Sequence, residues 1–319
     1  MKIKIVNDLN FVRQARELGV SVWQSPSFLF LMMGIIAVAA MTATYYVSRN
    51  YDNPELVVIS ESIVVVLIFI IGNSVIKGVE QVANINKMKN EFISIASHQL
   101  RTPISAINWE TEILLSKFQK GMTSEQIGGI ETIRALSGRM TKLVNDLLDV
   151  TKIDQGRMIL KNEEVDLGVI TQEVLRNFFP LVKAKNIRVS INDGGRTYIC
   201  LGDREKVKLV VENLISNSVK YIATRGKIEI RIKKSKGFSV FSIKDNGVGI
   251  PQKQQRQVFD KFFRSDNILK YQTEGTGLGL YIAKNIVEQI GGIIWFRSKE
   301  DIGSVFSFSL PLKSCKVMK

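Results

Sequence analysis

The chain has 319 residues, which is enough for two or three folded units. It carries 44 Lys and Arg against 30 Asp and Glu, and the formal charge of +14 suits a protein that lies against anionic lipid and handles a polyanion such as a nucleotide. The basic residues are scattered and lack an aromatic stacking pattern, so nucleic-acid binding is not indicated. A single histidine and two cysteines exclude a histidine–cysteine metal site.

Two apolar segments near the N-terminus predict transmembrane helices. Residues 28–47 carry no charge, and 20 helical residues span about 30 Å, the thickness of a bilayer core. Residues 56–76 form the second apolar segment, with Glu61 as its one acid. The alternative is a pair of buried core helices, which the lengths disfavour. A cleaved signal peptide is also disfavoured, because the first segment is long and starts far from Met1.

The charges around these segments predict that both chain ends are cytoplasmic. The flanking segments 1–27 and 77–89 are basic, whereas the loop 48–55 carries one Arg and two acids. Eight loop residues are too few for an extracytoplasmic ligand-binding domain. Glu61 lies about 8 Å into the bilayer if the span starts at residue 56. Its carboxylate either reaches back to the interface or makes a functional polar contact within the membrane.

Residues 77–89 are predicted to continue the second span as a helical linker, and residues 90–156 to form two amphipathic helices. The first helix, about 90–118, has apolar residues at steps of three and four along one stripe. These are Phe92, Ala96, Leu100, Pro103 and Ile107. His98 lies about 200° around the axis from its apolar neighbours. The only imidazole of the chain is therefore expected on the exposed face, where it can act as a nucleophile.

The second amphipathic helix is expected to begin at Thr123 or Ser124, because either is a favourable N-cap. Its apolar residues again follow a narrow stripe, namely Ile130, Ile133, Met140, Leu143, Leu147 and Val150. Two helices with narrow stripes cannot bury both stripes against each other. The pattern therefore predicts a homodimer that forms a four-helix bundle.

Residues 157–313 alternate between helical and strand patterns, and residues 314–319 form a tail. Helices are expected over 168–185, 207–221 and 278–290, and strands over 187–191, 227–232, 238–243, 293–296 and 305–308. This order predicts a two-layer α/β sandwich of about 150 residues. Cys200 and Cys315 fall in this cytoplasmic part, so a disulfide is not expected.

Two groups of polar residues in this domain suggest chemistry. Asn213 and Asn217 lie four apart on one helix face, and amide oxygens suit Mg²⁺ in company with phosphates. Taken alone, the two asparagines favour a helix-capping or surface role. Asp245-Asn-Gly-Val-Gly249 follows a strand, where the acid can accept a hydrogen bond from an amino group and glycines allow close approach of a flat ligand. Taken alone, this sequence is a β-turn.

Two further segments are glycine-rich or basic. Gly275-Thr-Gly-Leu-Gly279 opens a helix and offers free N–H groups to a phosphate, although it is not the dinucleotide-binding pattern Gly-x-Gly-x-x-Gly. Residues 251–274 contain Lys261 and Arg264 among phenylalanines and are interpreted as a mobile lid that carries cations.

The order and spacing of these motifs resemble the sensor histidine kinases of bacterial two-component systems, over about residues 85–312. His98-Gln-Leu-Arg-Thr-Pro103 is similar to the family's phosphoacceptor box, and Asn213-Leu-Ile-Ser-Asn217-Ser-Val-Lys-Tyr221 to its asparagine box. The segments 245–249, 259–264 and 275–279 match the remaining boxes in the family's order. The resemblance implies a Bergerat-type ATP-binding domain, the fold shared with gyrase and MutL.

The resemblance also implies a role for each motif residue. His98 would be the phosphoacceptor, Asn217 helped by Asn213 would hold Mg²⁺, and Asp245 would recognise the adenine amino group of ATP. Further residues are expected near the nucleotide: Lys220, Tyr221, Gly247, Gly249, Lys261, Arg264, Gly275, Thr276, Gly277, Leu278 and Gly279. The expected partner is the receiver aspartate of a response regulator, and the expected location is the bacterial inner membrane, crossed twice.

One position departs from the family pattern. The family usually has Glu or Asp directly after the histidine, and here that residue is Gln99. A carboxylate there would accept a proton from the imidazole, and such base assistance is worth roughly 10²–10⁴-fold in rate. Thr102 remains, and the resemblance implies that it assists dephosphorylation of the regulator. The sequence thus leaves open a phosphatase-biased enzyme and a non-catalytic ATP-binding membrane scaffold.

Overall fold

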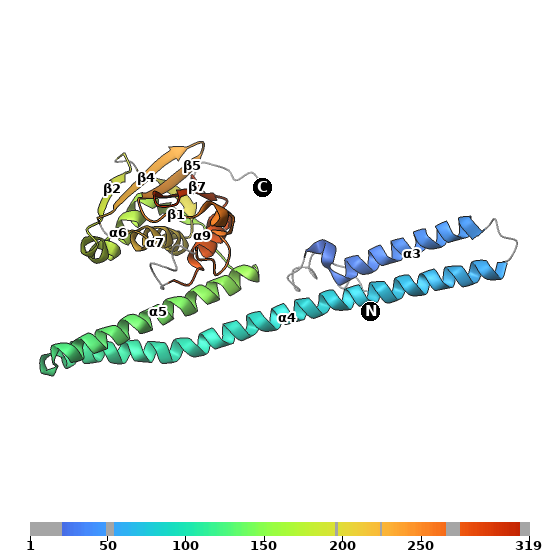
Figure 1. Cartoon of the computed structure of the whole chain (residues 1–319), viewed down its shortest axis with the longest axis horizontal. Helices are drawn as coiled ribbons and strands as arrows, with labels where there is room; N and C mark the ends of the chain where they lie inside the picture. The colour runs from blue at the N-terminus through green and yellow to red at the C-terminus, as the bar shows by residue number, and fades with distance from the viewer. Residues whose placement is uncertain (1–20, 49–53, 195–196, 224, 266–274, 313–319) are drawn as a thin grey trace. The chain divides into compact units, whose positions relative to one another are not determined.

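A computed structural model describes residues 21–48, 54–194, 197–223, 225–265 and 275–312. The chain divides into two compact units, residues 1–99 and 100–319. The boundary falls inside one long helix, so the two units share a continuous backbone (Figure 1). The domain boundaries given above stay a prediction, and most of the segments 1–27, 48–55 and 314–319 lies outside the described residues.

The first unit consists of two apolar helices that pack side by side. After the short 3₁₀-helix η1 (Val22–Gln24), α3 spans Pro26–Ser48 and α4 begins at Pro54. Both helices are long and apolar enough to cross a membrane, and the most apolar part of each buries no residue within the protein. This exposure disfavours the alternative of two core helices. A Cβ atom on Gly72 would lie 1.9 Å from Met33 Sδ, so glycine leaves room for the Met33 side chain between the two helices.

Helix α4 (Pro54–Lys117) continues through the predicted linker without a break and contains Pro103 in its interior. Glu61 lies in α4 with a half-buried side chain, and both readings of this residue still stand. His98 lies in the same helix and is exposed, as its place opposite the stripe predicts.

The turn after α4 is built as the sequence predicts. The short 3₁₀-helix η2 (Gln119–Gly121) leads to α5 (Ser124–Asp154), whose N-cap is Thr123. The Thr123 hydroxyl accepts from Gln126 N–H at 3.2 Å, and the Gln126 side chain accepts from Thr123 N–H at 2.9 Å. This reciprocal capping box satisfies two helix-end donors.

In the second unit, α5 runs antiparallel to the last part of α4. Arg101 donates to Asn145 at 3.2 Å, and Ser137 Oγ donates to the Ile104 carbonyl at 3.2 Å. The apolar stripes stay largely exposed on the single chain, with Leu100 47% and Met140 51% exposed. These exposed stripes are what a second copy would cover, and the dimer stays a prediction.

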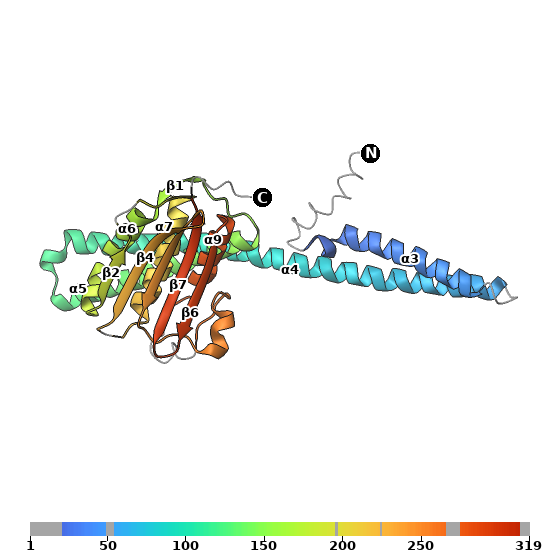
Figure 2. The ribbon, with the colours of Figure 1, turned by 90° about the horizontal axis from the view of Figure 1, so that it is seen from above.

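The domain after α5 is a two-layer α/β sandwich, which confirms the predicted fold class. Its five-stranded sheet has the order β2-β4-β5-β7-β6. The strands span Arg188–Asn192 (β2), Lys227–Ser235 (β4), Phe238–Asp245 (β5), Ile293–Lys299 (β6) and Gly303–Pro311 (β7). All neighbours pair antiparallel except β2 and β4. Helices α6 (Leu167–Ala184), α7 (Arg204–Lys220) and α9 (Gly279–Gln289) cover one face, and Figure 2 looks onto the other.

The core lies between the helices and this covered face. Alternate strand residues such as Ile230, Phe241 and Phe308 point inward and are fully buried, and Leu214 and Ile282 meet them from the helices. The period of two in the strands and the apolar side of each helix generate this layer.

Three short elements escape the sequence analysis. Strand β1 (Glu163–Asp166) pairs antiparallel with β3 (Ile199–Gly202), and the 3₁₀-helix η3 (Gln252–Gln257) lies within the predicted lid. Neither β1 nor β3 alternates, because Glu163–Asp166 contains one apolar residue and Ile199–Gly202 contains three in a row. Cys200 in β3 is a buried free thiol, and Cys315 lies outside the described residues.

The capping box gives a local test of the α4–α5 turn. Thr123→Ala removes the side-chain acceptor and should destabilise the first turn of α5 by about 1 kcal/mol. Amide hydrogen exchange in this turn should then become roughly fivefold faster in the variant. Ser124→Ala is the matched control, since Ser124 is the first helical residue rather than the cap. Equal exchange rates in all three proteins would contradict the capping role.

Candidate functional site

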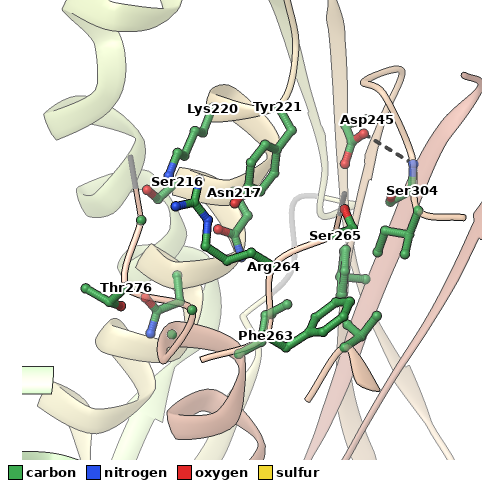
Figure 3. A pocket seen from close by; sticks show the side chains of 18 of the residues that line it. Ser216, Asn217, Lys220, Tyr221, Asp245, Phe263, Arg264, Ser265, Thr276 and Ser304 are labelled. Carbon is green, nitrogen blue, oxygen red and sulfur yellow. Dashed lines mark hydrogen bonds between the residues drawn. The ribbon is translucent and has the colours of Figure 1, made fainter. Parts of the chain in front are cut away.

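A cavity of about 640 Å³ lies in the second unit, and most of the predicted nucleotide residues line it (Figure 3). Its walls come from α7, the C-terminal end of β5, β7, the start of α9, α5 and the chain on both sides of residues 266–274. The predicted residues in the lining are Asn213, Asn217, Lys220, Tyr221, Asp245, Gly249, Arg264, Gly275, Thr276, Gly277 and Gly279. The fold thus brings four separate motifs to one cavity of the size that small-molecule ligands occupy.

Helix α7 divides its residues between the core and the cavity. Asp203 caps its N-terminus by accepting from Lys206 N–H at 3.1 Å. Val211 and Leu214 face the core, whereas Asn217 lines the cavity and points the same way as Asn213, one turn earlier. The asparagines therefore occupy the boundary between the two faces.

Asn213 has an unfilled hydrogen-bonding capacity. Its side chain is 5% exposed, and its Nδ2 has no partner among the described residues. A Cβ atom on Gly279 would lie 2.7 Å from Asn213 Oδ1, so glycine lets the N-terminus of α9 approach this amide. Leaving a buried polar group unpaired is costly. The site therefore fits an oxygen-rich ligand next to the free N–H groups of α9.

The Asp245 carboxylate is held in place by three donors. Its Oδ1 accepts from Gly247 N–H at 3.0 Å and from Ser304 N–H at 3.2 Å, as Figure 3 shows for Ser304. Its Oδ2 accepts from Ser218 Oγ at 3.2 Å. Burial raises the pKa of Asp245, and these three hydrogen bonds oppose the rise. The oriented carboxylate can accept a further hydrogen bond from the amino group of a planar ligand.

The glycines after Asp245 permit two close approaches. Gly249 has φ +63°, and a Cβ atom there would lie 2.0 Å from the Lys299 carbonyl oxygen. Gly247 does not line the cavity; a Cβ atom on it would lie 2.6 Å from the Tyr221 carbonyl oxygen. The loop after β5 therefore packs tightly against the end of α7 and the β6–β7 turn.

Lys185 is a cavity residue that the sequence analysis missed. Its Nζ donates to the carbonyls of Val219 at 3.0 Å, Lys220 at 3.1 Å and Ile222 at 2.9 Å. Burial lowers the pKa of Lys185. The Lys185 ammonium thus caps the C-terminus of α7. Tyr221, the C-cap residue of this helix, lines the cavity. No local motif marks this lysine, because its partners are more than 30 residues away.

The structure does not bring Lys261 or Leu278 to the cavity wall. Lys261 Nζ binds both Asp154 carboxylate oxygens at 2.7 and 2.6 Å and lies 4.9 Å from the Tyr281 ring centre. The Tyr281 hydroxyl also donates to Asp154, at 2.9 Å. Burial and, as the smaller cause, the interaction with Asp154 raise the pKa of Tyr281 to about 12. Leu278 is buried in the core. Lys261 therefore anchors its segment to α5.

Helix α5 contributes to the cavity, and no sequence motif indicated this. Arg139, Lys142 and Asp146 line it, and the Thr276 hydroxyl donates to Asp146 Oδ2 at 3.2 Å. Burial raises the pKa of Asp146. Two cations from α5 therefore join Lys220 and Arg264, so the lining is suited to a polyanionic ligand.

The predicted catalytic residues are all on α4. His98, Gln99 and Thr102 have exposed side chains, and none of them lines the cavity. His98 and Gln99 belong to the first unit and Thr102 to the second.

The donor set around the cavity fits Mg²⁺ only in company with phosphates. Among the described residues, no group of three or more His, Cys, Asp or Glu side chains could hold a metal ion. Mg²⁺ usually takes one or two protein oxygens and completes its shell with phosphate and water oxygens. The amides of Asn213 and Asn217 can supply such oxygens beside the N-terminus of α9.

Comparison with known proteins assigns a family to this architecture. Residues 88–156 match the His Kinase A (phospho-acceptor) domain, and residues 202–314 match the histidine kinase-, DNA gyrase B- and HSP90-like ATPase family. Together the two matches cover more than half of the chain. The chain belongs to the histidine kinases of two-component systems.

Named relatives of this chain are sensor kinases. The sensor histidine kinase WalK of Bacillus subtilis (strain 168) is 31% identical over 252 residues, which are 75% of this chain and 39% of WalK. The sensor protein GacS of Pseudomonas syringae pv. syringae is 31% identical over 72% of this chain and 26% of GacS. The kinase CikA of Synechococcus elongatus is 29% identical over 71% of this chain and 30% of CikA. The chain thus spans less than half the length of each.

The fold also matches a solved histidine kinase. Full-length ShkA, crystallised in complex with AMPPNP, superposes with a TM-score of 0.57 at 23% identity, over 69% of this chain and 45% of that one. At this identity, the likeness concerns the fold alone.

Asp245→Asn should weaken nucleotide recognition. The side-chain oxygen of asparagine can still accept hydrogen bonds from Gly247 N–H and Ser304 N–H. Its amide nitrogen is a donor, however, and cannot accept a hydrogen bond from an amino group of the ligand. ATP affinity should fall by about 5- to 150-fold, equivalent to the roughly 1–3 kcal/mol of a lost buried hydrogen bond. Titration calorimetry of the variant against wild type measures this. Asp301→Asn, in the exposed β6–β7 turn, is the control.

The same variant should change the pH dependence of unfolding. Because burial raises the pKa of Asp245 in the folded state above its usual value of 3.8, the folded state holds this proton more tightly than the unfolded state. Wild-type stability from this group therefore falls as the pH rises above that value. Asp245→Asn should gain stability relative to wild type between acid and neutral pH in thermal unfolding. A constant difference across this range would contradict the cost of burying the carboxylate.

Proposed function

We propose that this chain is a dimeric sensor histidine kinase of the bacterial cytoplasmic membrane, which phosphorylates His98 from Mg·ATP and passes the phosphoryl group to a response-regulator aspartate. The observation that carries the proposal is the cavity in which the buried Asp245 carboxylate faces the asparagines of α7 and the start of α9. Membership of the histidine kinase family supports the same assignment.

Different residues of the cavity would bind the adenine and the phosphates of the nucleotide. Asp245 would accept a hydrogen bond from the adenine amino group. Lys220 and Arg264 would lie near the phosphates, with the N-terminus of α9. Asn217, helped by Asn213, would hold Mg²⁺, which when bound neutralises charge on the phosphate oxygens. The protein would then act mainly by positioning and charge neutralisation, as in other phosphoryl transfers.

His98 would act as the nucleophile of the first transfer. One nitrogen of its neutral imidazole attacks the γ-phosphorus, the bond to the bridging oxygen of ADP breaks, and the ring loses a proton. Gln99 is adjacent in α4 and can orient the ring by a hydrogen bond. It cannot accept the proton, so water would take it.

Membrane attachment and dimerisation rest on the apolar surfaces of the helices. α3 and the first part of α4 are compatible with two spans, and the flanking charges favour cytoplasmic ends. The exposed stripes of α4 and α5 would meet those of a second copy in a four-helix bundle. With so short a loop outside the bilayer, a stimulus would act through the spans, the N-terminal segment or a partner protein.

Two other functions are tested by the same experiments. A phosphatase-biased enzyme is favoured by Gln99, because the missing carboxylate would slow phosphorylation while Thr102 remains. A non-catalytic ATP-binding membrane scaffold would bind nucleotide without labelling His98.

His98→Gln should abolish acid-labile phosphorylation of the full-length chain in membranes, because the chain contains no other histidine. Incubation with radiolabelled ATP followed by acid treatment measures this. ATP binding should be unchanged in His98→Gln, whereas Asn217→Ala should lose Mg²⁺-dependent binding and labelling together. Acid-labile label in His98→Gln would rule out the acceptor, and absence of label in the wild type would favour the scaffold.

Gln99→Glu should raise the rate of autophosphorylation without tightening ATP binding. The new carboxylate restores a proton acceptor, an effect worth up to roughly 10²–10⁴-fold. Gln99→Ala is the control, because it removes the ring-orienting amide without adding a base. A rate in Gln99→Glu that does not exceed the wild-type rate would show that proton removal does not limit the reaction.

A further inference from the structure

The open face of the five-stranded sheet is strongly basic. On this face, away from α6, α7 and α9, strand register brings together cations from four strands. They are Arg188, Lys227, Arg231, Lys233, Lys244, Arg297 and Lys299, all exposed. We name this set the basic sheet face. Glu229 is the only acid in its described strand positions, so seven cations stand against one carboxylate.

The single acid does not cancel the charge of the face. Glu229 accepts from Lys227 at 2.6 Å and lies 3.6 Å from Arg231. The pKa of Glu229 is lowered, mainly by the hydrogen bond from Lys227. Lys244 lies opposite Glu229 in the strand register and also stabilises its charge. Lys233 and Arg297 form no ion pair with Glu229. Two further acids, Glu300 and Asp301, lie in the turn that ends β6 rather than on the strands. The field above the sheet is therefore positive.

A pair of serines lies at the centre of the face, and one edge is apolar. Ser242 and Ser307 lie opposite each other and are hydrogen-bonded at 2.9 Å. On the edge strand β6, Ile293 is 65% and Trp295 is 39% exposed. Tryptophan beside basic residues is the composition typical of a membrane–water interface.

Neither the nucleotide cavity nor α5 uses this face. The cavity opens on the helical side of the sheet, where Phe306 of β7 points into it. α5 contacts the domain through α9, α7 and Lys261, on the helical side of the sheet. Trp295 is the only exposed aromatic side chain in the described strands of the face, so the stacking platform of a single-stranded nucleic-acid site is not formed.

We propose that the basic sheet face docks on the anionic lipid headgroups of the membrane in which the chain is anchored, with Ile293 and Trp295 entering the interface. The proposal rests on the membrane location given under the proposed function. Headgroup attraction acts within a Debye length and adds up over Lys and Arg near the surface. Anchoring keeps the domain at high local concentration near the bilayer, so weak contacts suffice.

The test uses the full-length chain in nanodiscs of zwitterionic lipid alone or with about one third anionic lipid, an anionic content comparable to that of natural inner leaflets. Lysine acetylation read by mass spectrometry reports headgroup contact. Lys233 and Lys244 should react at least roughly fivefold more slowly on anionic discs, since each basic residue near the surface contributes about that factor. Lys183, exposed on α6, should not change, and 1 M salt should remove the protection.

Paired charge reversals isolate the face. Trp295 emission should shift to the blue on anionic discs in wild type and in Arg176→Glu/Lys183→Glu, which changes the same charge on α6. Lys233→Glu/Lys244→Glu should lose this shift, with unchanged ATP binding. Trp295→Phe identifies the contribution of Trp295 against the other two tryptophans.

The outcomes separate this proposal from the kinase assignment. His98→Gln should keep the lysine protection, because docking needs no phosphorylation. Equal protection of Lys183 and Lys233, or protection only on addition of nucleic acid, would overturn the docking. If alkaline carbonate extracted the chain from membranes, the membrane location on which the docking rests would be wrong. Absence of His98 labelling by itself would overturn only the kinase assignment.

Discussion

The nucleotide half of this protein depends on the burial of one carboxylate, Asp245. An isolated buried charge is expensive, and it persists only where hydrogen bonds replace the lost water. Here the three donors come from three places in the fold: the loop after β5, the start of β7 and the side of α7. Because the β5–β7 register and the α7 packing fix these donors, the cavity is formed before any ligand binds. The core thereby sets the geometry of the site.

Helix α5 packs against the last part of α4 and also contacts the α/β sandwich domain. Asp146, Asp149 and Asp154 lie on one side of it, and each binds a different part of the ATP-binding domain. Their partners are Thr276 before α9, Lys206 on α7 and Lys261 after η3. The two ion pairs, Asp149–Lys206 and Asp154–Lys261, join partly exposed groups and are individually weak. The contact of Thr276 with Asp146 is a hydrogen bond to a buried carboxylate.

The sequence predicted what periodicity and local motifs encode. The five long strands, the main helices and the cap at Thr123 follow from patterns within ten or twenty residues. Lys185, Ser304 and the α5 wall could not be predicted, because their partners are distant in sequence and no local pattern selects them. Lys261 shows the opposite limit: its motif was recognised, yet Asp154 rather than the cavity binds its ammonium. Strands β1 and β3 could not be predicted because their sequences do not alternate between apolar and polar residues.

The continuity of α4 has a mechanical consequence. Its 64 residues correspond to about 96 Å of helix at 1.5 Å per residue. Pro103 has no N–H to donate to the carbonyl of Gln99, four residues earlier, and proline is the usual cause of a sharp kink. Pro103 is the only proline in the interior of α4, and it lies five residues, about 1.4 turns, after His98. A bending load on α4 would therefore meet its weakest backbone hydrogen bonding next to the imidazole.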